Sequence, residues 1–166
     1  LNEVRQMDIE QAFADDEDVM RVREEIFVYM LRAVKEQCSG QLKALDRELR
    51  VPEPPLRRLT YTDAVALLQG SGEAIRWGDD FSKAQERRLW ELVGEEAFFV
   101  KDWPAVQKPF YAMPHEDNPE IVHAFDLIHN GIEVCSGTQR IHVPELLRER
   151  LRTKGLNPDD FTHYIG

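Results

Sequence analysis

Two acidic side chains, Asp126 and Glu133, lie on either side of an Asn130-Gly131 dipeptide and between apolar residues. Asn-Gly favours a two-residue type I′ turn, so the flanking runs are predicted to pair as a β-hairpin over 121–142. This pairing places Cys135 opposite Asp126, and because side chains alternate along a strand, both carboxylates share one face. The carboxylates are then diagonal neighbours, about 7 Å apart at the backbone. Like charges this close repel one another unless a cation lies between them.

The second strand of this hairpin leads to Arg140, seven residues past Glu133. An odd step places Arg140 on the opposite face of a regular strand. A bulge at Ser136-Gly137, where glycine interrupts the strand pattern, restores the parity. Arg140, Ser136 and Glu133 then line one surface with Asp126. Two carboxylates and a hydroxyl suit Mg²⁺, and a guanidinium suits a carboxylate ligand. An exposed sheet face with scattered charges explains the same spacing equally well.

The composition narrows the class of protein. The chain has 166 residues, a formal net charge of −10, 42% hydrophobic residues and 31% charged residues, which is typical of one globular domain. An acidic chain is not a general binder of phosphate backbones, so any contact with nucleic acid must be local or made elsewhere. Cys38 and Cys135 form no CxxC pair, which argues against a structural zinc site and favours a reducing cytoplasm. No apolar run reaches membrane-spanning length, so no membrane partner is expected.

The periodicity of apolar residues predicts an α+β fold, an antiparallel β-sheet with flanking helices. Helices are predicted over 17–37, 41–49, 63–69, 83–94 and 144–153, with a last short helix from Pro158. Strands are predicted over 3–14, over 97–101 and in the hairpin. Thr62 is the expected cap of the helix over 63–69. Residues 49–95 are therefore predicted to form a small helical insertion between strands.

Several motifs together resemble a known family. The motifs are Phe125-Asp126-Leu127, Gly131-Ile132-Glu133, Ser136 to His142, Lys108 to Pro114 and Lys154 to Pro158. In this order they resemble an aspartyl-tRNA synthetase of the archaeal and eukaryotic type, a class II aminoacyl-tRNA synthetase. Residues 1–10 resemble the return strand of that family's second signature motif. The resemblance covers nearly all of residues 1–166 and implies an incomplete class II synthetase catalytic core.

The resemblance implies roles for the hairpin residues. Asp126, Glu133 and Ser136 match the positions that hold Mg²⁺ and the ATP phosphates, and Ser136 also borders the substrate. Arg140 matches the arginine that pairs with the side-chain carboxylate of L-aspartate. Its planar fork favours a carboxylate over the neutral amide of asparagine. The run from Gln139 to His142 is the most discriminating motif, because asparaginyl enzymes tend to follow the arginine with an acidic residue.

Residues outside the hairpin also match functional positions of the family. Asp8 matches an acidic residue that meets the ammonium group of the substrate, and Leu1 matches the end of a loop that contacts ATP. Lys108 and Tyr111 match residues on the loop near the amino-acid pocket. Mg²⁺ is the implied cofactor, and ATP, L-aspartate and tRNA are the implied partners.

The implied function is that of an aspartate–tRNA ligase, which forms aspartyl-adenylate and passes the aspartyl group to tRNA(Asp). Charging of tRNA(Asn) as well would depend on anticodon contacts outside this chain. An asparagine-forming paralogue that combines the same adenylate with ammonia is an alternative, as is a catalytically silent interaction module. The parent enzyme is expected to be a homodimer.

The sequence also departs from the family pattern. The anticodon-binding domain, the first signature motif, the arginine of the second motif and the glycine-rich third motif have no counterpart in it. The apolar chain ends favour a piece of a longer protein. We therefore expect the 166-residue segment alone not to activate aspartate, and ATP–pyrophosphate exchange above a control without protein would contradict this.

Overall fold

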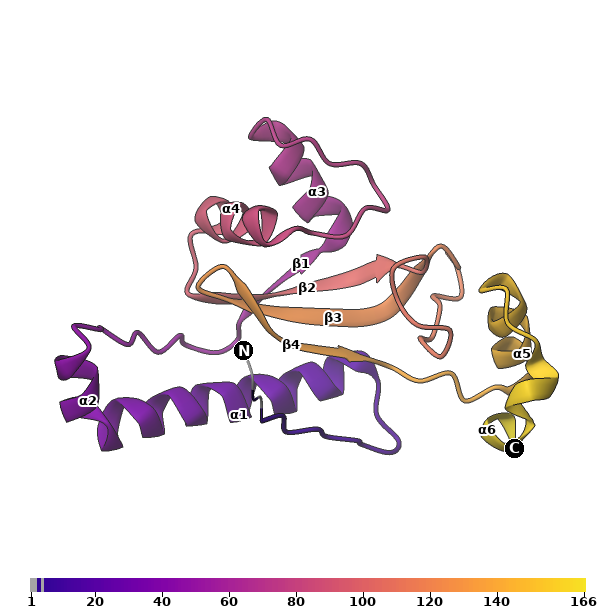
Figure 1. Cartoon of the computed structure of the whole chain (residues 1–166), viewed down its shortest axis with the longest axis horizontal. Coiled ribbons are helices and arrows are strands. Elements are labelled where there is room, and N and C mark those ends of the chain that lie inside the picture. The colour runs from indigo at the N-terminus through magenta and orange to yellow at the C-terminus, as the bar shows by residue number, and fades with distance from the viewer. Residues whose placement is uncertain (1–2, 4) are drawn as a thin grey trace.

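The computed structural model describes residues 3 and 5–166, and it contains a four-stranded sheet between two layers of helices (Figure 1). The helices are α1 (Asp16–Gln37), α2 (Ser39–Ala44), α3 (Tyr61–Gly70), α4 (Lys83–Val93), α5 (Pro144–Thr153), the 3-10 helix η1 (Pro158–Phe161) and α6 (Thr162–Ile165). The strands are β1 (Arg57–Thr60), β2 (Ala97–Pro104), β3 (Ile121–His129) and β4 (Ile132–Thr138). The α+β class expected from the sequence is confirmed.

The strands are ordered β1-β2-β3-β4, and the last three form an antiparallel meander. β1 instead pairs with β2 in parallel, because α3 and α4 cross over between them. The expectation of a wholly antiparallel sheet is therefore wrong at one edge. The segment over 49–95 contains the two predicted helices and also this strand. The strand was not predicted because its two arginines, Arg57 and Arg58, interrupt the alternation of apolar and polar residues.

The strand predicted over 3–14 does not form in residues 3 and 5–14, the part of this segment that the structure describes. In the described part of this segment, no residue belongs to a helix or strand, and most side chains are exposed. The segment runs alongside α1 in Figure 1. An alternating pattern forms a strand only where a ladder partner satisfies its backbone groups, and the described residues of this segment pair with no strand. Leu1 lies outside the described residues.

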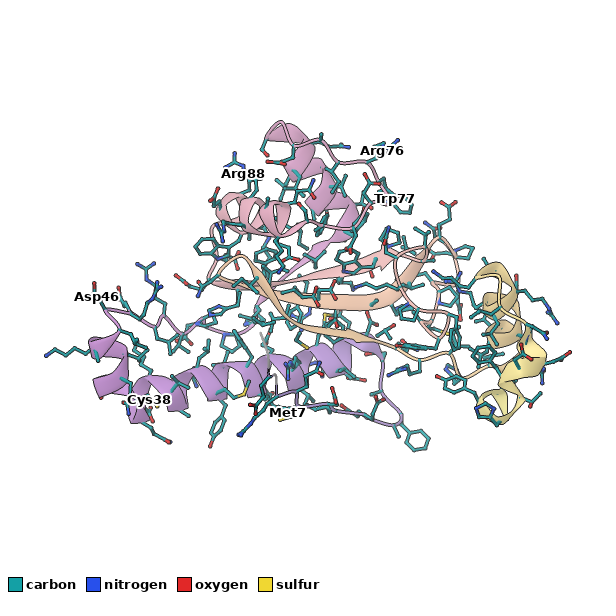
Figure 2. All side chains as sticks on the ribbon, in the orientation of Figure 1. Met7, Cys38, Asp46, Arg76, Trp77 and Arg88 are labelled. Carbon is teal, nitrogen blue, oxygen red and sulfur yellow. The ribbon has the colours of Figure 1, made fainter. Side chains whose placement is uncertain are left out.

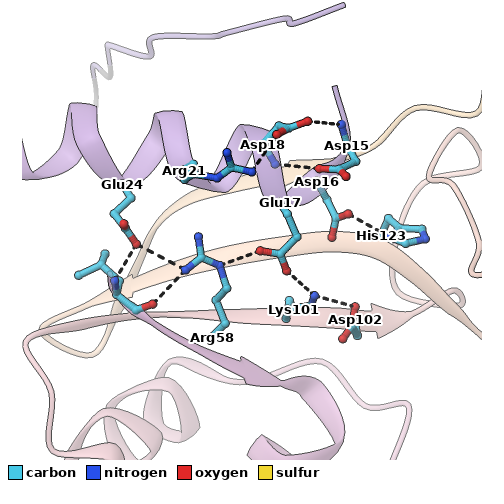
Figure 3. Close-up of polar contacts among 11 residues, drawn as sticks. Asp15, Asp16, Glu17, Asp18, Arg21, Glu24, Arg58, Lys101, Asp102 and His123 are labelled. Carbon is cyan, nitrogen blue, oxygen red and sulfur yellow. Dashed lines mark hydrogen bonds and ion pairs between the residues drawn. The ribbon is translucent and has the colours of Figure 1, made fainter. Parts of the chain in front are cut away.

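α1 covers one face of the sheet and is joined to β1 and β2 by a chain of charged groups (Figure 3). The buried carboxylate of Glu24 accepts a hydrogen bond of 2.7 Å from the backbone N–H of Leu56. Arg58 lies between Glu24, at 3.7 Å, and Glu17, at 2.9 Å. Glu17 also accepts a hydrogen bond of 2.6 Å from Lys101. These contacts fix the position of α1 along the sheet.

α3 and α4 cover the opposite face of the sheet (Figure 1). Thr60, and not the predicted Thr62, caps α3, since its hydroxyl accepts the backbone N–H of Asp63. α4 begins at the predicted position, where Ser82 and Gln85 form a capping box. Side chains fill the space between this layer and the sheet. Trp77 lies on the side of the layer that faces away from the sheet (Figure 2).

α5, η1 and α6 form a third group at the end of the molecule, where they pack with the loop around Phe110. The bounds of α5 agree with the predicted helix over 144–153. None of the helices in the described part of the chain combines the length and the apolar character that crossing a membrane requires.

Candidate active site

The central hairpin forms around the predicted turn. Asn130 and Gly131 have φ values of 51° and 72°, as a type I′ turn requires. The pairs nearest the turn form as predicted, but the register then shifts between residues 127 and 128, and Val134 is left as an extra residue. Ser136, rather than Cys135, therefore lies opposite Asp126. The prediction of a bulge at Ser136-Gly137 is therefore wrong in its position, because β4 carries its extra residue at Val134, closer to the turn.

The shift decides which side chains share a face. Asp126 and Ser136 face each other across the ladder, and Glu133 lies opposite Ile128 on the same side of the sheet. This is the face on which α3 and α4 pack. Cys135, predicted on this face, instead packs with Phe125 in the core beneath α1. The prediction is wrong for Cys135 because the extra residue reverses the parity of β4.

Asp126 is paired with a lysine from the loop between β2 and β3. The Lys108 ammonium lies 2.8 and 3.0 Å from the two carboxylate oxygens, and Asp126 is only 3% exposed. Burial raises the pKa of Asp126 from 3.8 to about 7, the Lys108 ammonium opposes this rise, and the charge of Glu133 adds to it. The same ammonium lies 4.1 Å from the ring centroid of Trp103. Asp126 is thus a buried carboxylate whose ionisation depends on its neighbours.

Glu133 lies at the exposed end of this face, where the N-terminal turn of α4 approaches the hairpin. Its backbone N–H donates to a carboxylate oxygen of Glu86 at 3.3 Å. Burial raises the pKa of Glu86, and the like charges of Glu133 and Asp80 add to the rise. The helix therefore contributes a further acidic side chain, Glu86, to this end of the site, which the sequence alone did not place there.

Arg140 follows β4, and its guanidinium stacks on the ring of Tyr111. Its guanidinium carbon lies 4.2 Å from the ring centroid of Tyr111, and its backbone bridges to Ala112. One guanidinium nitrogen lies 3.2 Å from a carboxylate oxygen of Glu10. A guanidinium stacked on an aromatic face and paired with a carboxylate is arranged to recognise an anionic group. Arg140 and Tyr111, singled out separately in the sequence, are therefore brought together.

An open cavity of about 950 Å³ lies between the N-terminal segment, α1 and β4. Asp8, Ser136 and Arg140 all line it, together with Arg23 and His142. Its volume is within the range of small-molecule sites. The cavity is not lined by Glu133, Tyr111 or the buried pair of Asp126 and Lys108, so it gathers only some of the predicted residues.

The oxygen donors on this face are of the kind that bind magnesium. Glu133 and Ser136 are exposed on the face that also carries Asp126, and carboxylate and hydroxyl oxygens suit Mg²⁺. Both oxygens of Asp126 are, however, paired with Lys108. Among residues 3 and 5–166, no three His, Cys, Asp or Glu side chains converge on one point. The exposed oxygens of Glu133 and Ser136 therefore fit an ion at the surface of this face, rather than an ion enclosed by protein.

Two residues that touch this site were not singled out for it from the sequence. Trp103 contacts Lys108 through its ring, and Glu10 pairs with Arg140. The acidic alternation of Asp8 and Glu10 was a usable signal for the second. No local pattern marks Trp103, because its role depends on a loop lysine folding back over it.

Comparison with known proteins defines the class to which this fold and site belong. A family profile described as tRNA synthetases class II (D, K and N) matches residues 1–166. The chain is 43% identical over 165 residues to "Aspartate--tRNA(Asp/Asn) ligase" of Methanothermobacter thermautotrophicus, with 99% of this chain and 38% of the relative covered. The protein of the same name from Methanosarcina barkeri is 42% identical over 170 residues, with the same coverage.

Solved structures agree with this class. An aspartyl tRNA synthetase from Entamoeba histolytica superposes with a TM-score of 0.84 at 32% identity, over 92% of this chain and 33% of that chain. An asparaginyl-tRNA synthetase from Pyrococcus horikoshii, complexed with asparaginyl-adenylate, gives a TM-score of 0.84 at 30% identity, over 93% and 36% of the two chains. The fold of this chain is that of a class II aminoacyl-tRNA synthetase. Within that class, the chain belongs to the family of the D, K and N synthetases, and it spans 38% of the length of the curated relatives named above.

Proposed function

We propose that this chain forms part of the catalytic domain of an aspartate–tRNA ligase. Such an enzyme joins L-aspartate and ATP as aspartyl-adenylate and then passes the aspartyl group to the 3′ end of tRNA(Asp). The observation that carries the proposal is the presentation of Arg140 on the ring of Tyr111, beside a cavity that Asp8 also lines. A guanidinium recognises the side-chain carboxylate, and an acidic residue suits the α-ammonium group. The names of the related ligases support the same assignment.

The hairpin supplies the groups for the nucleotide. We assign Glu133, Ser136 and Asp126 to Mg²⁺ and the ATP phosphates, and Leu1 to ATP. When bound, the ion stabilises negative charge on the α-phosphate. Each Asp126 oxygen accepts one hydrogen bond from Lys108 in this structure, so the remaining lone pairs of the carboxylate would be the ones offered to the ion. We assign the remaining donor of the Lys108 ammonium to the amino acid.

Other features of the proposed enzyme depend on regions beyond these residues. The net charge of −10 is unfavourable for phosphate backbones, so tRNA, whether tRNA(Asp) alone or also tRNA(Asn), would be bound mainly by other parts of the enzyme. We assign the enzyme to the cytoplasm, where the free thiols of Cys38 and Cys135 remain reduced. We infer a homodimer for the complete enzyme.

Calorimetric titration of the chain with L-aspartate and L-asparagine tests the proposal. Tighter binding of L-aspartate is expected, and Arg140→Gln should weaken it about tenfold to a hundredfold, the range for a charged hydrogen-bond partner. Arg32→Gln is the matched control, because Arg32 is also an exposed arginine with a single exposed carboxylate partner, Glu53. Equal binding of the two amino acids, or unchanged aspartate binding by the Arg140 variant, would contradict the proposal.

A further inference from the structure

Lys108 belongs to a loop, yet its ammonium is held between two buried groups. One side meets the Asp126 carboxylate at 2.8 and 3.0 Å, and the other meets the Trp103 ring at 4.1 Å from its centroid. Only 17% of the Lys108 side chain is exposed. A lysine on a flexible stem normally samples many rotamers, so this confinement needs a rigid support.

That support is Trp103, which is fixed by an aromatic cluster. Trp103 is 2% exposed, and its indole N–H donates to the backbone oxygen of Val100 at 3.3 Å. The ring centroids of Tyr61 and Phe81 lie 4.9 and 5.0 Å from that of Trp103. These two rings stack on each other at 5.3 Å. Both come from the segment between β1 and β2, so the inserted layer reaches the candidate site through Trp103.

We propose that Trp103 is a positioning residue of the candidate active site, and that its ring, braced by Tyr61 and Phe81, holds the Lys108 ammonium on Asp126. The inference rests on the proposed function only in treating Lys108 and Asp126 as active-site groups. The face of an indole attracts an ammonium most strongly among the aromatic rings, above all where water is excluded. The Asp126 carboxylate then pairs with a Lys108 ammonium whose position the Trp103 ring fixes.

The arrangement has a consequence for the amino acid. The Lys108 ammonium has three N–H donors. Two of them point to the two oxygens of Asp126, which leaves one donor. With the ring on one side and the carboxylate on another, the remaining donor has a restricted direction. Trp103 therefore determines where Lys108 presents its positive charge to an anionic ligand.

Nuclear magnetic resonance of the lysine ammonium groups tests the proposal on this chain without any ligand. In the wild-type chain, the ¹⁵N signal of Lys108 is expected to be visible, because pairing slows exchange of its protons with water. In Trp103→Leu, the exchange rate should rise about thirtyfold, the factor that a cation–π contact of about 2 kcal/mol at a desolvated site supplies. Trp103→Phe keeps a ring face and should restore most of the slow exchange.

Two controls separate positioning by Trp103 from a general effect of removing an indole that contacts Tyr61. Trp77→Leu removes an indole that also contacts Tyr61, at 6.0 Å between ring centroids. Among the residues that the structure describes, Trp77 makes no hydrogen bond or ring contact with Asp126 or Lys108. This substitution should leave the Lys108 signal unchanged. Lys101, paired with Glu17 beneath α1 at 2.6 Å, is an internal reference whose signal should stay the same in every variant.

The outcomes are decisive in both directions. Faster exchange confined to Lys108 in Trp103→Leu, with recovery in Trp103→Phe, supports the proposal. Unchanged exchange in Trp103→Leu, an equal change in Trp77→Leu, or a parallel change at Lys101 overturns it. If Trp103→Leu fails to fold, Phe81→Leu replaces it, since loss of the bracing ring should speed exchange at Lys108 in the same way. Because no substrate is present, failure here is distinct from failure of aspartate binding by the chain.

Discussion

Phe125 and Gly137 lie opposite each other in the β3–β4 ladder, and the phenyl ring covers the glycine. A Cβ at residue 137 would lie 2.3 Å from the end of that ring. Alanine would therefore force the ring or the strand to move, and with it Ser136. We expect Gly137→Ala to lower the free energy of unfolding by about 1–3 kcal/mol, the usual cost of overpacking a core. Urea denaturation measures this change.

Gly40→Ala is the control for this substitution. Gly40 lies in α2, and a Cβ there meets nothing within 4 Å. Alanine is also the better helix former, so stability should be unchanged or slightly raised. A Gly137 variant as stable as the Gly40 variant would show that β4 does not need the glycine.

The hairpin turn packs against α4 at Gly131. Its φ is +72°, and a Cβ would lie 2.9 Å from the Cα of Arg87. Gly155 has nearly the same φ, +74°, but nothing within 4 Å of a Cβ. Alanine at either position is strained by about 1–2 kcal/mol. Thermal unfolding should show a larger loss for Gly131→Ala, because it also displaces α4, and equal losses would argue against this contact.

Glu24 is the buried acceptor that joins α1 to the start of β1. Glu24→Ala leaves the backbone N–H of Leu56 and the guanidinium of Arg58 without this partner. We expect a loss of about 3 kcal/mol in the free energy of unfolding, measured by chemical denaturation. Glu24→Gln keeps an acceptor and should lose less. Its exposed neighbour provides the control, since Glu25→Ala should change stability by no more than about 0.5 kcal/mol.

The buried carboxyl of Asp126 links stability to pH. Because its pKa rises from 3.8 to about 7 in the folded chain, the folded chain binds a proton that the unfolded chain has released between these values. The free energy of unfolding should therefore fall as the pH rises across this interval. Asn cannot titrate, so the melting temperature of Asp126→Asn should fall less than that of the wild type between pH ~5 and pH ~8. Parallel pH profiles of the two proteins would contradict the buried, proton-binding state.

Local signals in the sequence predicted the elements that depend on local chemistry. Asn130-Gly131 predicted the turn because few other pairs adopt positive φ at both positions, and both positions do so here. The helix predicted over 83–94 begins at the expected residue, since Ser82 caps it through contacts that lie within one turn. The α+β class followed from the apolar periodicities of these same segments.

Contacts between distant segments decided the rest. Glycine in a strand is typical of either a bulge or a close approach, and only the ring of Phe125 shows that Gly137 serves the close approach. The extra residue is Val134 instead, and this sends Cys135 into the core under α1. The sequence predicted a strand in the N-terminal segment and none at β1. Both predictions are wrong because a strand forms only where a partner satisfies its backbone hydrogen bonds.

The sequence by itself determined the turn and the main helices, because each depends on neighbours along the chain, and its resemblance to a synthetase family indicated the site residues. The tertiary structure alone decided that Ser136 faces Asp126 and that Lys108 lies between Asp126 and Trp103. Register and burial are set by packing between segments far apart in the chain, so no local pattern encodes them.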